Sequence, residues 1–225
     1  EVIAAKAKEL GSPAYKVVQA GAKVLGNNKD GIDFSLEDDY YGDTRFHIPF
    51  IAWYQVMNAS LALTTMEVLK DRIPVTLEQL QAGIANTRWQ GRMETILPGV
   101  IVDGAHNEDG VRRFVETAER FQKEYPLTLL FSAVNDKDYQ DMIHTICSRI
   151  KFRKVVTTEV GGYREVPSAE LAEIFCKEGC KDVGNSDNIE EAFHMAHEAK
   201  GEDGMLFCVG SLYLVGEIKT LLLKK

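Results

Sequence analysis

The sequence lacks the two glycine-rich signatures that most often mark nucleotide-binding domains, because it contains neither a GxxxxGK[ST] phosphate loop nor a GxGxxG segment. Without the second signature, a nicotinamide-dependent dehydrogenase is excluded. No run approaches the roughly twenty apolar residues that a membrane helix requires. Basic residues are too few for a nucleic-acid surface, since 26 Lys and Arg accompany 34 Asp and Glu and the net charge is −8. Local positive groups must therefore meet any anionic ligand.

Cysteine is also scarce, and the four cysteines form no CxxC pair. This pattern favours reduced thiols in a cytoplasmic protein over a disulfide framework. The chain has 225 residues, 45% of them hydrophobic, so it can bury a substantial core. Because the sequence begins without Met, inside an amphipathic run over residues 1–10, we expect a fragment of a longer protein.

The first part of the chain is predicted to form a small antiparallel sheet followed by two helices. We expect strands over residues 15–20, 32–36 and 40–48, then helices over 55–69 and 76–85. Thr76 and Gln79 have the spacing of a helix capping box. The linker at residues 86–89 is the best domain boundary, so we predict two domains, residues 1–88 and residues 89–225.

After residue 89, short apolar strands alternate with amphipathic helices. We expect strands over residues 100–103, 127–133, 154–158 and 205–209, and helices over 108–123, 138–149, 168–177, 189–199 and 211–223. This order predicts an α/β fold with a Rossmann-like, mostly parallel sheet and helices on both faces. Ligands bind at the carboxyl ends of the strands in such sheets.

Polar residues follow three of these predicted strands. The pentapeptide DGAHN at residues 103–107 ends one strand, where Asp103 can accept ribose hydroxyls and His106 can meet an anion. The alternative is that Asp103 and Asn107 only cap the next helix. Ser211 follows another predicted strand and is typical of a helix cap. Its hydroxyl and the nearby amides could also bind a carboxylate.

Two cationic residues complete this set. Arg92, in the segment WQGRME at residues 89–94, can hold phosphate oxygens in a bidentate way. Lys137 lies in the segment DKD at residues 136–138, after a third strand. Taken singly, each cation is more often a solvated surface charge. Together they predict an anion-binding edge of the sheet.

These motifs resemble a known family, the folylpolyglutamate and dihydrofolate synthases of the Mur ligase superfamily. The resemblance rests on the order and spacing of GIDF at residues 31–34, Asn58-Ala59, GRME at 91–94, DGAHN at 103–107, DKD at 136–138 and Gly210-Ser211. It covers essentially the whole chain. It implies a C-terminal Mur ligase-type domain preceded by the β-hairpin and helical tail of a central ATP-binding domain.

The resemblance implies an ATP-dependent ligase. ATP phosphorylates the carboxylate of folate, dihydropteroate or a folate polyglutamate, and the amine of L-glutamate displaces phosphate from the acyl phosphate. By the same resemblance Arg92, Asp103 and Asn58 contact ATP, whereas His106, Ser211 and Lys137 hold glutamate. ATP and Mg²⁺ are the expected cofactors, because the reaction brings several anions together.

Two departures from the family pattern limit what can be transferred. The phosphate loop is lacking, so we expect it, the magnesium ligands and most of the folate site in a preceding N-terminal part, which would be the partner of this chain. We therefore assign no catalytic residue or metal ligand here and expect the isolated chain to be an inactive monomer. Tyr54 lies where many relatives have a His, so that His has no counterpart.

Two other functions remain open. A cell-wall Mur peptide ligase shares the superfamily pattern, whereas a non-catalytic nucleotide-binding module would need the first segment to be a self-contained fold. His194 and His197 lie three residues apart on a predicted helix, but a third ligand with suitable spacing is lacking. A surface histidine pair is therefore the better interpretation.

Overall fold

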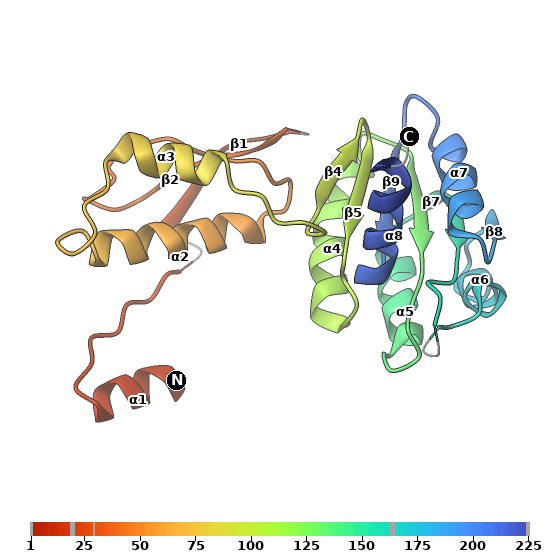
Figure 1. Cartoon of the computed structure of the whole chain (residues 1–225), viewed down its shortest axis with the longest axis horizontal. Helices are drawn as coiled ribbons and strands as arrows, with labels where there is room; N and C mark the ends of the chain where they lie inside the picture. Colours follow the sequence, from red (N-terminus) through yellow and green to blue (C-terminus); the bar gives the residue numbers. More distant parts are fainter. Residues whose placement is uncertain (1, 19–20, 29, 163–164, 224–225) are drawn as a thin grey trace. The chain divides into compact units, whose positions relative to one another are not determined.

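The computed structural model describes residues 2–18, 21–28, 30–162 and 165–223 of the chain (Figure 1). The chain divides into two compact units, Glu1–Arg88 and Trp89–Lys225. Each unit has its own sheet and its own hydrophobic core. The assignment of these units to the ATP-binding and ligase domains of a longer enzyme stays a prediction.

The first unit contains an antiparallel sheet of order β1-β2-β3 together with helices. Its elements are α1 (Val2–Glu9), β1 (Ala22–Asn28), β2 (Gly31–Leu36), β3 (Phe46–Ile48), α2 (Tyr54–Val68) and α3 (Leu77–Ala85). Phe34 and Phe46 are cross-strand neighbours and both are buried, and Leu63 of α2 belongs to the same core. The predicted capping box of α3 is confirmed, because Thr76 and Gln79 each bond the other's backbone.

The predicted first strand over residues 15–20 is wrong for the part that the structure describes. Residues 15–18 have no regular structure, and residues 19 and 20 lie outside the described ranges. The strand begins at Ala22 because residues 22–28 pair antiparallel with β2. The predicted strand over 40–48 also shortens to Phe46–Ile48, since Tyr41 donates its backbone N–H to Asp38 (2.7 Å) in a turn.

The second unit is a six-stranded sheet of order β4-β5-β9-β6-β7-β8. Its strands are β4 (Glu94–Leu97), β5 (Val100–Asp103), β6 (Leu127–Phe131), β7 (Phe152–Thr157), β8 (Val183–Asn185) and β9 (Met205–Val209). All neighbours are parallel except the antiparallel edge pair β4-β5. The predicted mostly parallel sheet is confirmed, although β4 and β8 are absent from the sequence-based assignment.

Helices cover both faces of this sheet, as predicted. They are α4 (Glu108–Phe121), α5 (Tyr139–Arg149), α6 (Ser168–Lys177), α7 (Ile189–Lys200) and α8 (Leu212–Leu223) (Figure 1). The chain moves from β5 through β6 and β7 to β8 in one direction and returns from β8 to β9 in the other. Right-handed crossovers therefore place α4, α5 and α6 on one face and α7 on the other, where α8 contacts it.

Buried apolar strands explain why the sheet lies between two helical layers. Every residue of β5, β6 and β9 is buried. The amphipathic helix α4 places Phe114 against Phe207 of β9, with ring centroids 5.5 Å apart.

Within the described residues, no helix combines the length and apolar character needed to cross a bilayer.

The backbone conformation and the close packing directly after β9 require a glycine, Gly210. Its φ is +111°, and a Cβ there would lie 2.0 Å from the Ser132 carbonyl oxygen. We expect Gly210→Ala to lower the free energy of unfolding by about 2 kcal/mol or more, because strain and overpacking add. Urea denaturation of the chain measures this loss.

Gly216, in α8, provides the matched control. A Cβ at Gly216 would meet nothing within 4 Å, so Gly216→Ala should raise stability by roughly 0.5 to 1 kcal/mol through helix propensity. Equal effects of the two substitutions would contradict the steric argument for Gly210.

Candidate functional site

The carboxyl ends of three parallel strands lie side by side at one end of the sheet of the second unit. Asp103 of β5 is in register with Val209 of β9, which is in register with Phe131 of β6. The segments that follow these residues therefore leave the sheet next to one another. This adjacency confirms the prediction that the three strand ends meet, whereas the ligand roles of their residues stay predictions.

Asp103 is a buried carboxylate with both oxygens in use. Its side chain accepts the backbone N–H of Met93 (2.9 Å) and that of Ala105 (2.7 Å), and only 3% of the residue is exposed. Burial raises the pKa of Asp103 to about 6, while the two backbone hydrogen bonds and the charges of Arg92 and His106 act in the opposite direction. Asp103 thus joins the 91–94 loop to the start of the DGAHN segment.

The loop that carries Arg92 has an unusual backbone. Gly91 has a φ of +66° and Met93 a φ of +47°, the latter being the one positive φ at a non-glycine residue in the described ranges. The carbonyl of Gly91 accepts the N–H of Gly104 (2.8 Å), and the side chain of Met93 is buried. Both sides of Arg92 are therefore held, which is how a strained segment persists.

A second anchor of this loop comes from the last helix. The Glu94 carboxylate accepts the N–H of Gly91 (2.8 Å) and two hydrogen bonds from Lys219 Nζ (2.7 and 3.0 Å). The side chains of Glu94 and Lys219 are 28% and 25% exposed. Sequence reasoning missed Lys219, because it lies 125 residues from Glu94 and no local pattern signals the pair.

The orientation of His106 follows from one hydrogen bond. Its Nδ1 lies 2.7 Å from the carbonyl oxygen of Gly104, which can only accept, so Nδ1 carries the hydrogen. Nε2 is then an acceptor in neutral imidazole and a donor in imidazolium. The cap of α4 is Asn107, which accepts the N–H of Gly110 (2.9 Å). The capping alternative is thus confirmed for Asn107 and wrong for Asp103.

Ser211 has the helix-capping function that its type suggests. Its Oγ accepts the N–H of Tyr213 (3.1 Å) at the start of α8, and the residue is 2% exposed. The first turn of α8 contains no acidic residue, unlike the first turns of α4, α5, α6 and α7. Among the helices described in this unit, α8 therefore has the amino end least neutralised by side chains.

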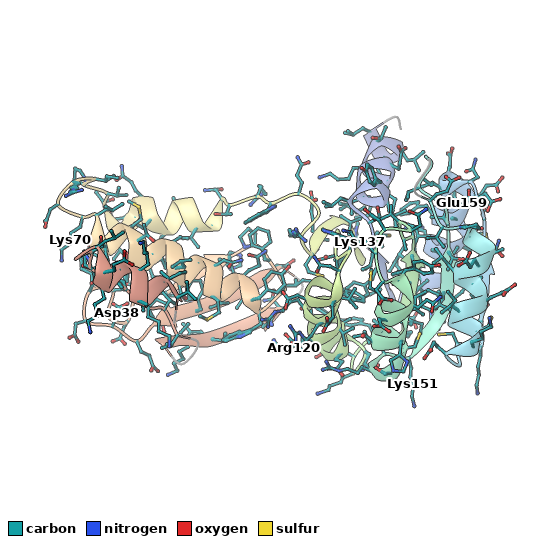
Figure 2. All side chains as sticks on the ribbon, turned by 90° about the horizontal axis from the view of Figure 1, so that it is seen from below. Asp38, Lys70, Arg120, Lys137, Lys151 and Glu159 are labelled. Atoms are coloured by element: carbon teal, nitrogen blue, oxygen red, sulfur yellow. The ribbon has the colours of Figure 1, made fainter. Side chains whose placement is uncertain are left out.

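The structure places Lys137 and Asn58 in different units. Lys137 lies in the turn between β6 and α5, where its N–H donates to the Val134 carbonyl (3.2 Å). In Figure 2, Lys137 lies apart from Arg120 and Lys151, which are at the lower border of the second unit. Asn58 lies on α2 of the first unit and donates through Nδ2 to Gln55 (2.8 Å). Only Arg92, Asp103, His106, Ser211 and Lys137 thus share a unit.

The described residues contain no group of three His, Cys, Asp or Glu side chains that could hold a metal ion. His194 lies 3.9 Å from Glu190, and the ring of His197 stacks on Phe193 with centroids 5.8 Å apart. The surface interpretation of this histidine pair is therefore supported. The arrangement at the sheet edge can instead bind anions through a guanidinium, an imidazole, a lysine and helix amino ends.

Residues 91–212, more than half of the chain, match the family described as Mur ligase, glutamate ligase domain, and the chain belongs to this family. The dihydrofolate synthase/folylpolyglutamate synthase of Bacillus subtilis is 30% identical over 194 residues, which are 83% of this chain and 43% of that protein. The resemblance inferred from the motifs is thereby confirmed.

Two solved structures show the same fold over nearly the whole chain. Folylpolyglutamate synthase from Thermotoga maritima aligns with a TM-score of 0.78 and 24% identity, covering 99% of this chain and 51% of its own. The Mycobacterium tuberculosis folylpolyglutamate synthase, complexed with ADP and AMPPCP, has a TM-score of 0.76 and 23% identity over 98% and 52%. The chain spans about half the length of these proteins.

The raised pKa of Asp103 predicts a pH-dependent stability. A carboxyl with a folded-state pKa near 6 and an ordinary unfolded value stabilises the fold most below about pH 4, and this contribution is lost as the pH rises through 6. Relative to Asp103→Asn, the wild type should therefore lose up to about 3 kcal/mol of unfolding free energy between pH 4 and 8. Urea denaturation across this range measures the difference.

Asp109, on the exposed first turn of α4, is the control for this titration. A hydrogen bond from Arg112 lowers the pKa of Asp109, so its contribution should be present above the unfolded pKa and lost as the pH falls. Asp109→Asn should consequently show the opposite slope or none. A pH-independent difference between wild type and Asp103→Asn would show that burial does not perturb Asp103.

Proposed function

We propose that this chain is the C-terminal part of an ATP-dependent ligase that joins L-glutamate to folate, its polyglutamates or dihydropteroate. The observation that carries the proposal is that the carboxyl ends of β5, β9 and β6 lie side by side and in register, in a chain that belongs to the Mur ligase family. The Bacillus subtilis match supports the folate-directed activity, because it extends over 83% of the chain, well beyond residues 91–212.

In this proposal ATP transfers its terminal phosphoryl group to the pteroate or glutamate carboxylate. The amine of the incoming glutamate then attacks the acyl carbon, an amide bond forms and inorganic phosphate leaves. The enzyme's contribution is positioning and charge stabilisation, since all three reactants carry negative charge.

Arg92 suits the nucleotide phosphates, because its backbone is held on both sides by the bonds of Gly91 and Met93. Asp103 has its two oxygens engaged with the backbone. Ribose binding through Asp103 would therefore use its remaining lone pairs. By the family resemblance, Asn58 of the first unit is also proposed to contact ATP.

The proposed glutamate site comprises His106, Ser211 and Lys137. The amino end of α8 suits a carboxylate, since no acidic side chain offsets its positive end. Protonated His106 can donate through Nε2, because Nδ1 is occupied by Gly104. Lys137, in the turn after β6, adds a cation to the same edge of the sheet.

The cofactors in this proposal are ATP and Mg²⁺. Arg92 fits the phosphates as a planar donor, whereas the described residues contain no three-ligand metal cluster. By the family resemblance, we propose that the magnesium ligands lie on the triphosphate and on a preceding part of the enzyme, which would be the partner of this chain. We also propose a monomeric enzyme in the cytoplasm, where the four free cysteines of the chain would stay reduced.

The second candidate is a cell-wall peptide ligase. It is favoured by the same family match over residues 91–212, which does not by itself distinguish folate from peptidoglycan precursors. Glutamate-dependent ADP release by the longer enzyme with dihydropteroate or tetrahydrofolate would support the folate substrate. Release with a nucleotide-linked muropeptide alone would replace it with the peptide ligase.

The isolated chain should show no ligase activity. It lacks a GxxxxGK[ST] loop, and the loss of the phosphate cradle should remove several kcal/mol of transition-state stabilisation. The assay is glutamate-dependent ADP release with pteroate and folate substrates. Turnover comparable with that of an intact relative would show that this chain carries the whole active site.

Arg92 and His106 should separate the nucleotide and glutamate subsites in an enzyme containing this chain. Arg92→Lys loses the planar fork and should cost about 1.5 to 3 kcal/mol in kcat/KM for ATP, the range for a charged hydrogen bond. His106→Ala should weaken glutamate use much more than ATP use. Steady-state kinetics, with each substrate varied in turn, measure both effects.

Arg120→Lys is the control for Arg92→Lys, since Arg120 is exposed in the last turn of α4, at the end of this helix away from the DGAHN segment. This exposed cation should be replaceable with almost no effect. If Arg92→Lys retains wild-type ATP kinetics while glutamate affinity collapses, the two subsites are assigned the wrong way round.

A further inference from the structure

The four cysteines of the second unit lie in different environments. Cys208 is fully buried in β9, and burial raises the pKa of its thiol. Cys176, on α6, is exposed. Cys147 and Cys180 are both half-buried, and their Sγ atoms are in contact at 3.6 Å although 33 residues separate them. At this distance an oxidant can convert the two thiols to a disulfide after small rotations about their side-chain bonds.

The fold brings these two cysteines together. Cys147 lies in the last turn of α5, which neighbours α6 on the same face of the sheet. After α6 the backbone turns at Gly179, whose φ is +93°. There the N–H of Gly179 donates to the Cys176 carbonyl (3.0 Å), and the N–H of Cys180 donates to Phe175 (3.1 Å). This turn directs Cys180 towards α5.

The contact makes the two thiols chemically unequal. Either Sγ can donate across this contact. With Cys147 as the donor, the hydrogen bond lowers the pKa of the Cys180 thiol, against the opposing effects of burial and of the Glu178 carboxylate. Acting as donor raises the pKa of Cys147. Glu178 also pairs with His144, one turn before Cys147 (3.0 Å). In that arrangement Cys180 is the more readily formed thiolate, and the thiolate is the nucleophile in exchange reactions.

We propose that Cys147 and Cys180 form a thiol–disulfide exchange site that reacts with low-molecular-weight disulfides of the glutathione type. The Cys180 thiolate attacks one sulfur of the small disulfide, whose S–S bond breaks and releases one thiol. Cys147 then gives up its proton to solvent and attacks the Cys180 sulfur, which releases the second thiol. Two protein thiols are thereby oxidised to one disulfide, and the small disulfide is reduced to two thiols.

The site is separate from the proposed ligase edge. Helix α5 begins after the carboxyl end of β6, so Cys147, in its last turn, lies near the opposite edge of the sheet. The Sγ atoms must approach by about 1.5 Å to reach disulfide length. The cross-link would close a loop across α6 and restrict the unfolded chain, which should raise the thermal midpoint.

The test is incubation of the purified chain with oxidised glutathione, followed by thiol titration under denaturing conditions and peptide mapping. The wild type should lose two of its four free thiols as one Cys147–Cys180 cross-link, reversible by dithiothreitol. Cys147→Ser should stop at a glutathione adduct on Cys180, whereas Cys180→Ser should form an adduct on Cys147 much more slowly, and this contrast establishes the order of attack. The oxidised wild type should also melt at a higher temperature than the reduced form.

Cys176→Ser is the matched control, because Cys176 is exposed and close in sequence to Cys180. This variant should form the cross-link as the wild type does. In the wild type, a Cys176–Cys180 disulfide would overturn the proposal, as would an adduct at Cys176 alone. Thermal melts of the reduced variants confirm that each one is folded before oxidation.

Discussion

The geometry of the second unit depends on one buried carboxylate. Asp103 ends a fully buried strand, where an uncompensated charge would cost several kcal/mol. Two backbone N–H groups offset part of this cost, since a hydrogen bond to a charged group contributes about 1.5 to 3 kcal/mol. Burial still outweighs them, because the pKa rises to about 6. The side chain thus joins two loops, but the net contribution of its charged form to the stability of the fold is small.

The arrangement around Asp103 also constrains its neighbours. Gly104 approaches α8 so closely that a Cβ there would lie 2.1 Å from the Leu212 side chain, and Gly210 approaches the Ser132 carbonyl in the same way. The positive φ of Met93 is maintained by the bond from its N–H to Asp103 and by the burial of its side chain. Close packing at the strand ends therefore explains both the glycines and the strained loop.

Much of this fold was predictable from sequence, because its determinants are local. Continuous apolar strands, amphipathic helices and the Thr76 cap each leave a short-range pattern, and the parallel order brings the strand ends together. The strand expected over residues 15–20 was wrong because alternation does not reveal which segment will pair with residues 31–36. The bond between Glu94 and Lys219 joins distant parts of the chain and has no local signal.

The chain is acidic overall, but the distribution of its charges is compatible with the proposed anion site at the carboxyl ends of the strands. Acidic side chains occupy the first turns of α4, α5, α6 and α7, where they stabilise each helix and neutralise its amino end. The first turn of α8 is apolar, and its cap is the neutral hydroxyl of Ser211. Lys219, further along α8, is held by Glu94 and so contributes little free positive charge. In the proposed anion site, positive charge would thus come from the amino end of α8, Arg92 and Lys137, which makes it local and independent of the net charge.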